Sequence, residues 1–440
     1  MTRVPFVAHG IGGRLDLPVP LTLFAAGAAA VLILTFLALA TLWPQPRLQD
    51  GPRLQATGQR IPLGFLNVLG VVGLLLVIVA GTSTLARGVD ELGTRNIGPI
   101  LLWVYFWLVV PFLGALLGDL YTGFNPWRTI SGWLGIGEVE RTQASGGGAP
   151  GLSVGLWPAA VLLTGVAWFE LIYPQSADPA AIAITAVLYS VFLLVAVTRY
   201  GRETALTSFD PFTSYNRLVS AISPFGRDDH GRLVRRGWLR ALIVLPAWPG
   251  LAAFAVVMIG TVSFDGLSGT SWWEAATGRF GASTLGKTLL LIAMCLVIGG
   301  TYYLACWLAV RLGGGARSPA MVAARFAHTL VPIAFAYAFA HYFTLIIFEG
   351  QSVISAASDP FGLGWDLFGT RTYKIDFFLG ALPIWYIQVG AIVLGHVAGV
   401  VLAHDRALLD FQGAGAVRSQ YAMLLLMVLL TTLGLFILAG

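Results

Sequence analysis

Four of the six histidines lie in two very apolar segments between Arg325 and His404. His328 and His341 belong to the first segment, and His396 and His404 belong to the second. Neutral imidazole is a common ligand for haem iron, copper and zinc, and its ionisation near neutral pH suits proton transfer. The two segments therefore predict a site for a transition metal, a haem or a proton.

The depth of these histidines can be compared if the two segments cross a membrane in opposite directions. His328 lies about 9 Å, and His396 about 12 Å, from the inner ends of their spans at 1.5 Å per residue. If the spans touch, these two imidazoles can meet as ligands. His341 lies about 220° around the helix from His328 and nearer the outer face. We expect it to act as an outer ligand or a proton relay.

Four more residues could relay protons or support the ligands: Tyr337, Glu349, Arg325 and His404. Ionisable groups inside a span cost several kcal/mol and usually face a cavity or a partner. Arg325 and Glu349 lie near span ends, as does Asp405, so a structural role in which they reach water is the alternative. Each histidine could also simply hydrogen-bond a neighbouring helix. Clustering of the histidines in two spans favours a site.

The predicted outer loops carry carboxylates that could pair with His341, and tryptophans that are typical interface anchors or a platform for a carbohydrate or amphiphile. These residues are Asp265, Trp272, Trp273, Glu274, Asp359, Trp365, Asp366 and Asp376. Glu349 and Gln351, at the end of the first histidine segment, are further candidate partners of His341.

Composition places the chain in a membrane, because 57% of its residues are hydrophobic and only 11% are charged, against about a quarter in soluble proteins. Ten segments are long and apolar enough to cross about 30 Å of hydrocarbon as helices: 21–43, 62–86, 99–118, 152–173, 180–200, 241–263, 284–311, 322–349, 379–404 and 419–439. We predict an all-α, polytopic bundle of about ten transmembrane helices, with the lipid bilayer as its partner. The arginines lie in loops and form no soluble basic domain, so we expect no nucleic-acid partner.

The distribution of Lys and Arg predicts the orientation. The N-terminal tail and the even-numbered loops hold eight of the 26, and the odd-numbered loops hold the other 18. The positive-inside rule then places both termini outside the cytoplasm.

The predicted organisation has four parts: an extracytoplasmic tail (1–20), five spans (21–200), a basic cytoplasmic loop (201–240) and five more spans (241–440) that include the histidine-bearing pair 322–404. Two halves of five spans would run in opposite senses, which is the inverted-repeat plan of many transporters.

Two predicted cytoplasmic loops share a capping motif, Asn125-Pro126 in one and Asp210-Pro211 in the other. Asn or Asp can cap a helix that has proline at its first position. The amphipathic segments that follow are expected to lie at the membrane interface, as anchors or as docking sites for other membrane subunits. A third motif, Asp359-Pro360, is on the predicted outer side.

Several stretches resemble one known family: AHGIGGRLDLPVP (8–20), NPWR (125–128), SFDGLSG (263–269), FAHTLVPIAFAYAFAHYF (326–343) and GHVAGVVLAHDRAL (395–408). They are similar to a bacterial family of multi-spanning membrane proteins often labelled "fenitrothion hydrolase", and the similarity covers nearly the whole chain. The resemblance implies hydrolysis of an organophosphate ester in the bacterial cytoplasmic (inner) membrane, and it assigns no catalytic residues. A phosphotriesterase normally needs metal-bound hydroxide held by histidines and carboxylates, and few carboxylates accompany these histidines.

Three functional hypotheses follow. The first is an intramembrane histidine site that binds a metal or haem in a redox or accessory role, with His328, His396 and His341 as ligands. The second is a proton-coupled small-molecule transporter in which the histidines carry the proton. The third is the ester hydrolase, and the residues alone do not decide between an enzyme, a transporter and an accessory subunit.

Overall fold

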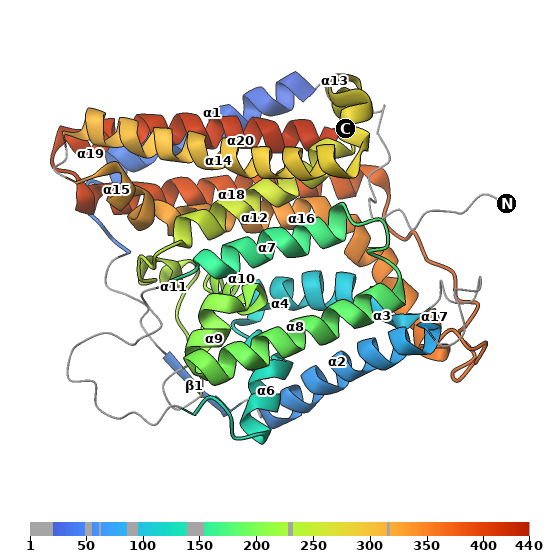
Figure 1. Cartoon of the computed structure of the whole chain (residues 1–440). Helices are drawn as coiled ribbons and strands as arrows, with labels where there is room; N and C mark the ends of the chain where they lie inside the picture. The colour runs from blue at the N-terminus through green and yellow to red at the C-terminus, as the bar shows by residue number, and fades with distance from the viewer. Residues whose placement is uncertain are drawn as a thin grey trace. The chain divides into compact units, whose positions relative to one another are not determined.

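The computed structural model describes residues 21–48, 55–60, 63–85, 96–138, 154–227, 232–314 and 317–439. The N-terminal tail lies outside these ranges, so its predicted place stays a prediction. Helices make up most of the described residues, as Figure 1 shows. The all-α fold class is confirmed.

Within the described ranges, nine helical segments are long and apolar enough to cross a membrane. Some are single helices and others are runs of short ones: α1 (Leu21–Leu42), α2 (Leu63–Leu85), α3 (Ile97–Pro99) with η2 (Ile100–Val109) and α4 (Val110–Leu117), α8 (Pro179–Tyr200), α12 (Leu251–Ser268), α14 (Thr284–Gly313), α15 (Pro319–Phe326) with η3 (Ala327–Leu330) and α16 (Val331–Ile347), α18 (Ala381–Asp410), and α19 (Ala414–Arg418) with α20 (Gln420–Ala439).

Large apolar side chains on these segments are exposed on the protein surface. Leu34, Leu188, Leu296 and Leu394 are each between 64% and 70% exposed. Such a surface suits lipid rather than water. The chain is therefore a multi-pass membrane protein. Its orientation, its membrane of residence and any other subunits stay predictions.

The fourth predicted span is shorter than expected. Helix α7 (Trp157–Leu171) has 15 residues and Pro158 near its start. At 1.5 Å per residue it is about 22 Å long, less than the hydrocarbon thickness of about 30 Å. An apolar stretch of sufficient length therefore need not be helical throughout.

The start of the sixth span was predicted wrongly. The structure begins α12 at Leu251, ten residues after the predicted start, because Pro246, Pro249 and Gly250 interrupt the chain. Gly250 has a φ of 81°, a left-handed conformation that glycine adopts without strain. At its other end α12 continues to Ser268, so Asp265 lies inside a helix and not in an outer loop.

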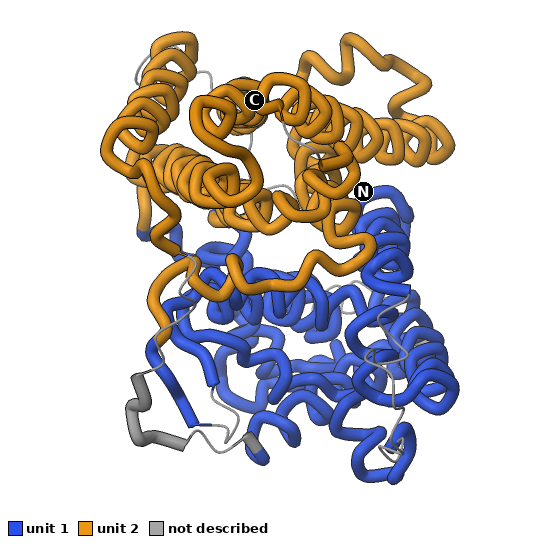
Figure 2. The backbone as a smooth tube through the Cα atoms, turned by 90° about the vertical axis from the view of Figure 1, so that its left-hand side faces the viewer, with its two compact units in different colours: residues 1–10, 54–235, 344–378 blue, residues 11–53, 236–343, 379–440 orange. Residues whose placement is uncertain are grey.

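Contacts divide the chain into two compact units, which are coloured in Figure 2. Unit 1 comprises residues 1–10, 54–235 and 344–378, and unit 2 comprises residues 11–53, 236–343 and 379–440. The first span, α1, belongs to unit 2 with the later helices. The units therefore differ from the segments 21–200 and 241–440, and the inverted repeat stays a prediction.

In unit 2, α1 packs against α18 and α20, and α14 packs against α12 and α20 (Figure 1). Glycines bring α18 directly onto α16 and η3. A Cβ atom on Gly395 would lie 2.3 Å from Cβ of Ala336, and one on Gly399 would lie 3.1 Å from the carbonyl oxygen of Thr329. Small residues allow this close approach of membrane helices.

In unit 1, α2 packs against α8. The shorter helices there are α5 (Tyr121–Phe124), α6 (Pro126–Trp133), α9 (Arg202–Phe209), α10 (Pro211–Ser220), η4 (Glu349–Gln351) and α17 (Ser352–Ser358). A small antiparallel sheet has the order β1 (Gln55–Arg60), β3 (Arg232–Arg235), β2 (Phe225–Arg227). Unit 2 adds α11 (Arg240–Ile243) and α13 (Ser271–Ala282).

Candidate functional site

A buried polar contact inside unit 2 joins α12 to α16. Nε2 of His341 lies 2.8 Å from Oδ2 of Asp265, and the hydroxyl of Tyr342 donates to the same oxygen at 2.8 Å. Asp265 is only 2% exposed. One buried carboxylate oxygen therefore accepts a hydrogen bond from an imidazole and a phenol, and this network assigns the Nε2 hydrogen.

A glycine next to the carboxylate makes room for the imidazole. A Cβ atom on Gly266 would lie 3.3 Å from Nδ1 of His341 and 2.2 Å from Cγ2 of Ile437. A larger residue would push α12 away from α16 and α20. The sequence Asp265-Gly266 thus supplies both the charge and the space beside it.

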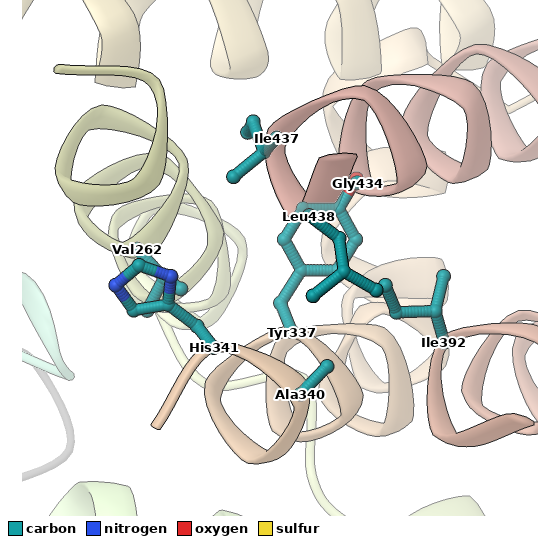
Figure 3. Close-up of a pocket in the computed structure, with 8 residues that line it drawn as sticks. All are labelled: Val262, Tyr337, Ala340, His341, Ile392, Gly434, Ile437 and Leu438. Atoms are coloured by element: carbon teal, nitrogen blue, oxygen red, sulfur yellow. The ribbon is translucent and has the colours of Figure 1, made fainter. Parts of the chain in front are cut away.

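A small cavity adjoins this contact (Figure 3), and it is lined by Val262, Tyr337, Ala340, His341, Ile392, Gly434, Ile437 and Leu438. It offers about 20 Å³ to the centres of water molecules, and a single water needs roughly 10–15 Å³ by this measure. The side chain of His341 is 12% exposed. A water-sized space therefore lies beside the imidazole of a buried carboxylate–imidazole pair.

Tyr337 and Ile392 connect this cavity to a second histidine. The hydroxyl of Tyr337 donates to the carbonyl oxygen of Leu430 on α20. Its ring centroid lies 5.8 Å from that of His396. Nδ1 of His396 lies 2.8 Å from the carbonyl oxygen of Ile392, so His396 contacts two residues that line the cavity.

His328 lies where the membrane-spanning helix tightens into a 3₁₀ turn. The 3₁₀ turn η3 separates α15 from α16, and Pro332 follows at the start of α16 without a backbone N–H to donate. His328 is 3% exposed, and its Nδ1 lies 3.0 Å from the carbonyl oxygen of Arg325.

His328 and His396 share one chemical state. Each Nδ1 faces a backbone carbonyl oxygen, so Nδ1 carries the hydrogen and Nε2 presents a lone pair. Both Nε2 atoms are buried and have no hydrogen-bond partner within the described part of the chain. Ligand imidazoles and proton acceptors both use this tautomer.

The structure does not bring His328 and His396 together as the predicted pair of ligands. Gly395 packs against Pro332 and Ala336, so His396 is level with these residues and about 8 Å from His328 along the helix axis. No ring contact joins the two imidazoles among the described residues. Helices α16 and α18 are in direct contact at Gly395, and the described residues contain no group of three metal-binding side chains. Ligation of a metal or haem stays a prediction that this arrangement does not support.

Arg325, predicted to support the histidines, has a structural partner. Its Nε atom lies 2.9 and 2.8 Å from the two carboxylate oxygens of Asp410, whose side chain is fully buried. Arg317 approaches the same carboxylate at 3.4 Å. These contacts hold α15 to the end of α18.

His404 and Asp405 hold the end of α1. Nδ1 of His404 lies 2.9 Å from Oε1 of Gln420, and its Nε2 lies 2.9 Å from the carbonyl oxygen of Trp43. Oδ1 of Asp405 accepts hydrogen bonds from the indole of Trp43 and the backbone N–H groups of Arg47 and Leu48. Both residues are 1% exposed, so they do not reach water at a span end, and neither ring nitrogen of His404 is left for a ligand.

Glu349 and Gln351 belong to η4 in unit 1. Burial raises the pKa of the Glu349 carboxyl above its usual value. The amide of Gln351 bonds Asp376 and Tyr373, which fixes the loop between the histidine-bearing spans.

Unit 1 has its own buried carboxylate. Asp210 is 0% exposed and joins the two predicted capping motifs, because Asn125 donates to it at 3.2 Å. Its other donors are the hydroxyls of Tyr121, Tyr189 and Thr213 and the backbone N–H of Phe212. Burial raises the pKa of Asp210 although these hydrogen bonds favour its charged form.

The segments that follow the two capping motifs were expected to lie at the membrane interface, and the structure differs from this expectation. Asn125 and Asp210 do cap α6 and α10, but eight of the ten residues of α10 are buried inside unit 1. The third motif was predicted wrongly as a cap: Asp359 accepts the backbone N–H groups of Leu363 and Gly364 and closes a turn.

Sequence reasoning missed Tyr342 and placed Asp265 in a loop. The position of His341 along its span predicted its depth in the membrane. Only the extension of α12 past Phe264 could show which carboxylate would reach this histidine. Comparisons of the chain with models of protein families, with curated proteins and with solved structures found no match. Function therefore rests on the geometry of the site.

Proposed function

We propose that the chain is a proton-coupled membrane transporter for a small molecule, with Asp265 and His341 as its proton-binding pair. The observation that carries this proposal is the buried carboxylate–imidazole contact inside a membrane span, beside a water-sized cavity. Ionisable groups at such depth are expensive, and in membrane proteins they commonly carry protons or ions.

The chemistry needs only the groups present. A proton delivered by water adds to Nδ1 of His341 and forms an imidazolium, while the Nε2 hydrogen stays on Nε2 and is donated to Asp265. The adjacent carboxylate stabilises that charge. Tyr342 keeps the accepting oxygen of Asp265 in place through its own hydrogen bond. Loss of the same Nδ1 proton to water reverses the step.

The 3₁₀ turn between α15 and α16 also favours transport. A stretch of 3₁₀ helix within a longer helix often marks a functional hinge. Here that stretch is η3, which carries His328. The turn supplies a place where the span can bend.

Ester hydrolysis, which the family resemblance implies, has less support from this geometry. Metal-bound hydroxide needs several converging ligands, and within the described ranges no three such side chains converge. The Asp265–His341 pair could orient a base, but no serine, threonine or cysteine lines the cavity beside it.

The test is infrared difference spectroscopy of the purified full chain as the pH is lowered. We expect a band of a protonated carboxyl or imidazolium group that is lost in both Asp265→Asn and His341→Gln. Thr431→Val is the matched control, because it removes another buried side-chain hydrogen bond of unit 2 outside the cavity. A wild-type spectrum without any band that depends on Asp265 and His341 would contradict the proposal.

A further inference from the structure

We infer that the proton bound at His341 continues to His396 and then to His328, so that three imidazoles form one route along α16 and α18. This inference rests on the proposed function, since the route begins at the Asp265–His341 pair. It concerns the onward path of the proton, which neither the pair nor the cavity defines alone.

The three imidazoles lie at successive depths. Gly395 is level with Pro332 and Ala336, and Gly399 is level with Thr329, so α16 and α18 are antiparallel neighbours. His396 is then about 11 Å from His341, and about 8 Å from His328, along the helix axis. Side chains and one or two waters can bridge steps of this length.

The first step begins at the cavity wall. Tyr337 and Ile392 both line the cavity, and both contact His396. The hydroxyl hydrogen of Tyr337 is held by Leu430, so Tyr337 forms the wall and does not pass a proton onward. Water that moves past this wall reaches the imidazole of His396.

The route also depends on the hydrogen bonding of the imidazoles of His396 and His328. A buried polar atom without a partner costs free energy and is rare in native proteins. Nε2 of His396 and Nε2 of His328 are two such atoms in neighbouring elements. Their lone pairs are therefore open to a proton.

The transfer step is balanced. Nε2 of His396 takes a proton from water and forms an imidazolium, while the Nδ1 hydrogen stays on Nδ1 and is donated to the carbonyl oxygen of Ile392. The same Nε2 then releases its proton to a water on the side of His328, whose Nε2 accepts it in the same way. No electron is transferred, and each imidazole returns to its starting tautomer.

His404 lies outside this route. Both of its ring nitrogens are bonded, one to Gln420 and the other to Trp43. Its contacts hold α1 in place and leave no lone pair open to a proton. The route therefore contains three of the four histidines in these segments.

The experiment records transient currents after a pH jump, using the full chain in liposomes adsorbed on a solid-supported membrane. The integrated current measures how far protons move into the protein. We expect His396→Leu to reduce the displaced charge at least twofold, because protons then stop at His341 and the remaining route of roughly 19 Å is lost. His328→Leu should reduce it by about 40%, since only the last step of about 8 Å in a route of about 19 Å is lost.

Two companion measurements separate the possible failures. The Asp265-dependent infrared band should persist in His396→Leu, and Thr431→Val should give the wild-type charge. His396→Gln can still donate a hydrogen bond to Ile392 but cannot be protonated. It should show the same reduced charge, and it replaces His396→Leu if the leucine variant does not fold.

Wild-type charge in both His396 variants, with the infrared band intact, would overturn the route and leave the proposed function standing. Absence of the band and of the current in the wild type would overturn the proposed function itself. A stoichiometric metal that disappears in His396→Gln would overturn the route as well, because a ligand nitrogen is not open to a proton.

Discussion

Several buried side chains in this protein make polar contacts that are strengthened by their apolar surroundings. Asp265, Asp405 and Asp410 are all buried in unit 2, and each meets several donors. A buried charge is stable only while its partners are present. Residue-level substitutions should therefore have large effects where they leave such a charge alone.

Arg325→Ala is the clearest case. It removes the main partner of the fully buried Asp410 carboxylate and leaves only the longer contact from Arg317. We expect a loss of about 3–5 kcal/mol in stability, the usual result of breaking a buried pair. Thermal unfolding in detergent measures the loss, with Arg311→Ala as the control because Arg311 stacks on Trp307 at the surface. Equal unfolding temperatures for the two variants would contradict the assignment.

Asp210 should give a pH dependence of definite sign. Burial raises its pKa in the folded protein, so the folded state holds the proton more tightly than the unfolded state. The stabilisation is fully present below the pKa of the unfolded chain and is lost as pH rises through the folded value. The difference in unfolding temperature between wild type and Asp210→Asn should therefore fall as pH rises. A difference that grows with pH would contradict this sign.

Glu203 should show the opposite trend. Its hydrogen bonds to Arg128, at 2.6 and 2.9 Å, lower the pKa of the Glu203 carboxyl. Its contribution is present above the pKa of the unfolded chain and is lost as pH falls through the folded value. Because Glu203 is 73% exposed, solvent screens the pair and the effect should be small. Calorimetry of Glu203→Gln across acidic pH measures it.

At the scale of the elements, glycines set how closely the helices of unit 2 approach. A Cβ atom on Gly395 would lie 2.8 Å from the carbonyl oxygen of Pro332, whereas one on Gly390 would meet no atom within 4 Å. Both glycines belong to α18. The helix therefore has one side that tolerates a methyl group and one that does not.

Gly395→Ala should separate α18 from α16. We expect a loss of about 1–3 kcal/mol from overpacking, together with a smaller proton transient because His396 moves with its helix. Gly390→Ala is the matched control and should keep both stability and current. An equal loss of stability in both variants would show that the contact of Gly395 with α16 is not the cause.

The sequence predicted helical elements better than their ends. Length and apolarity were sufficient for most spans because a helix in lipid must satisfy its own backbone. The start of α12 was wrong because the apolar residues before Leu251 are interrupted by prolines and a left-handed glycine. At its other end α12 continues five residues past the predicted end at 263, and this error placed Asp265 in a loop. Its contact with His341 was therefore open to prediction only as one of several.

The histidines illustrate the same limit at the site. Their depths followed from counting residues, and His396 and His328 do lie on adjoining elements. Their separation depended on the register between α16 and α18, which Gly395 and Gly399 determine. The register between two helices depends on the surfaces of both, and the hydropathy of each helix alone does not predict it.

At the scale of the whole molecule, α1 is tied to helices that come last in the chain. His404 and Asp405 bind the residues that follow α1, from Trp43 to Leu48. We expect Asp405→Ala to release this segment and to speed tryptic cleavage after Arg47, measured by limited proteolysis in detergent. Asp366→Ala, at an exposed position of unit 1, is the control. Unchanged cleavage after Arg47 would show that the segment is held in another way.

That late partnership has a consequence for biosynthesis. Helix α1 leaves the ribosome with residues 21–42, yet its partners α18 and α20 begin only at Ala381 and Gln420. Translation of the intervening 338 residues, 43–380, takes roughly 20 to 70 s. During that time the first helix must wait in the bilayer or against the insertion machinery, and the final fold of unit 2 cannot form until the chain is nearly finished.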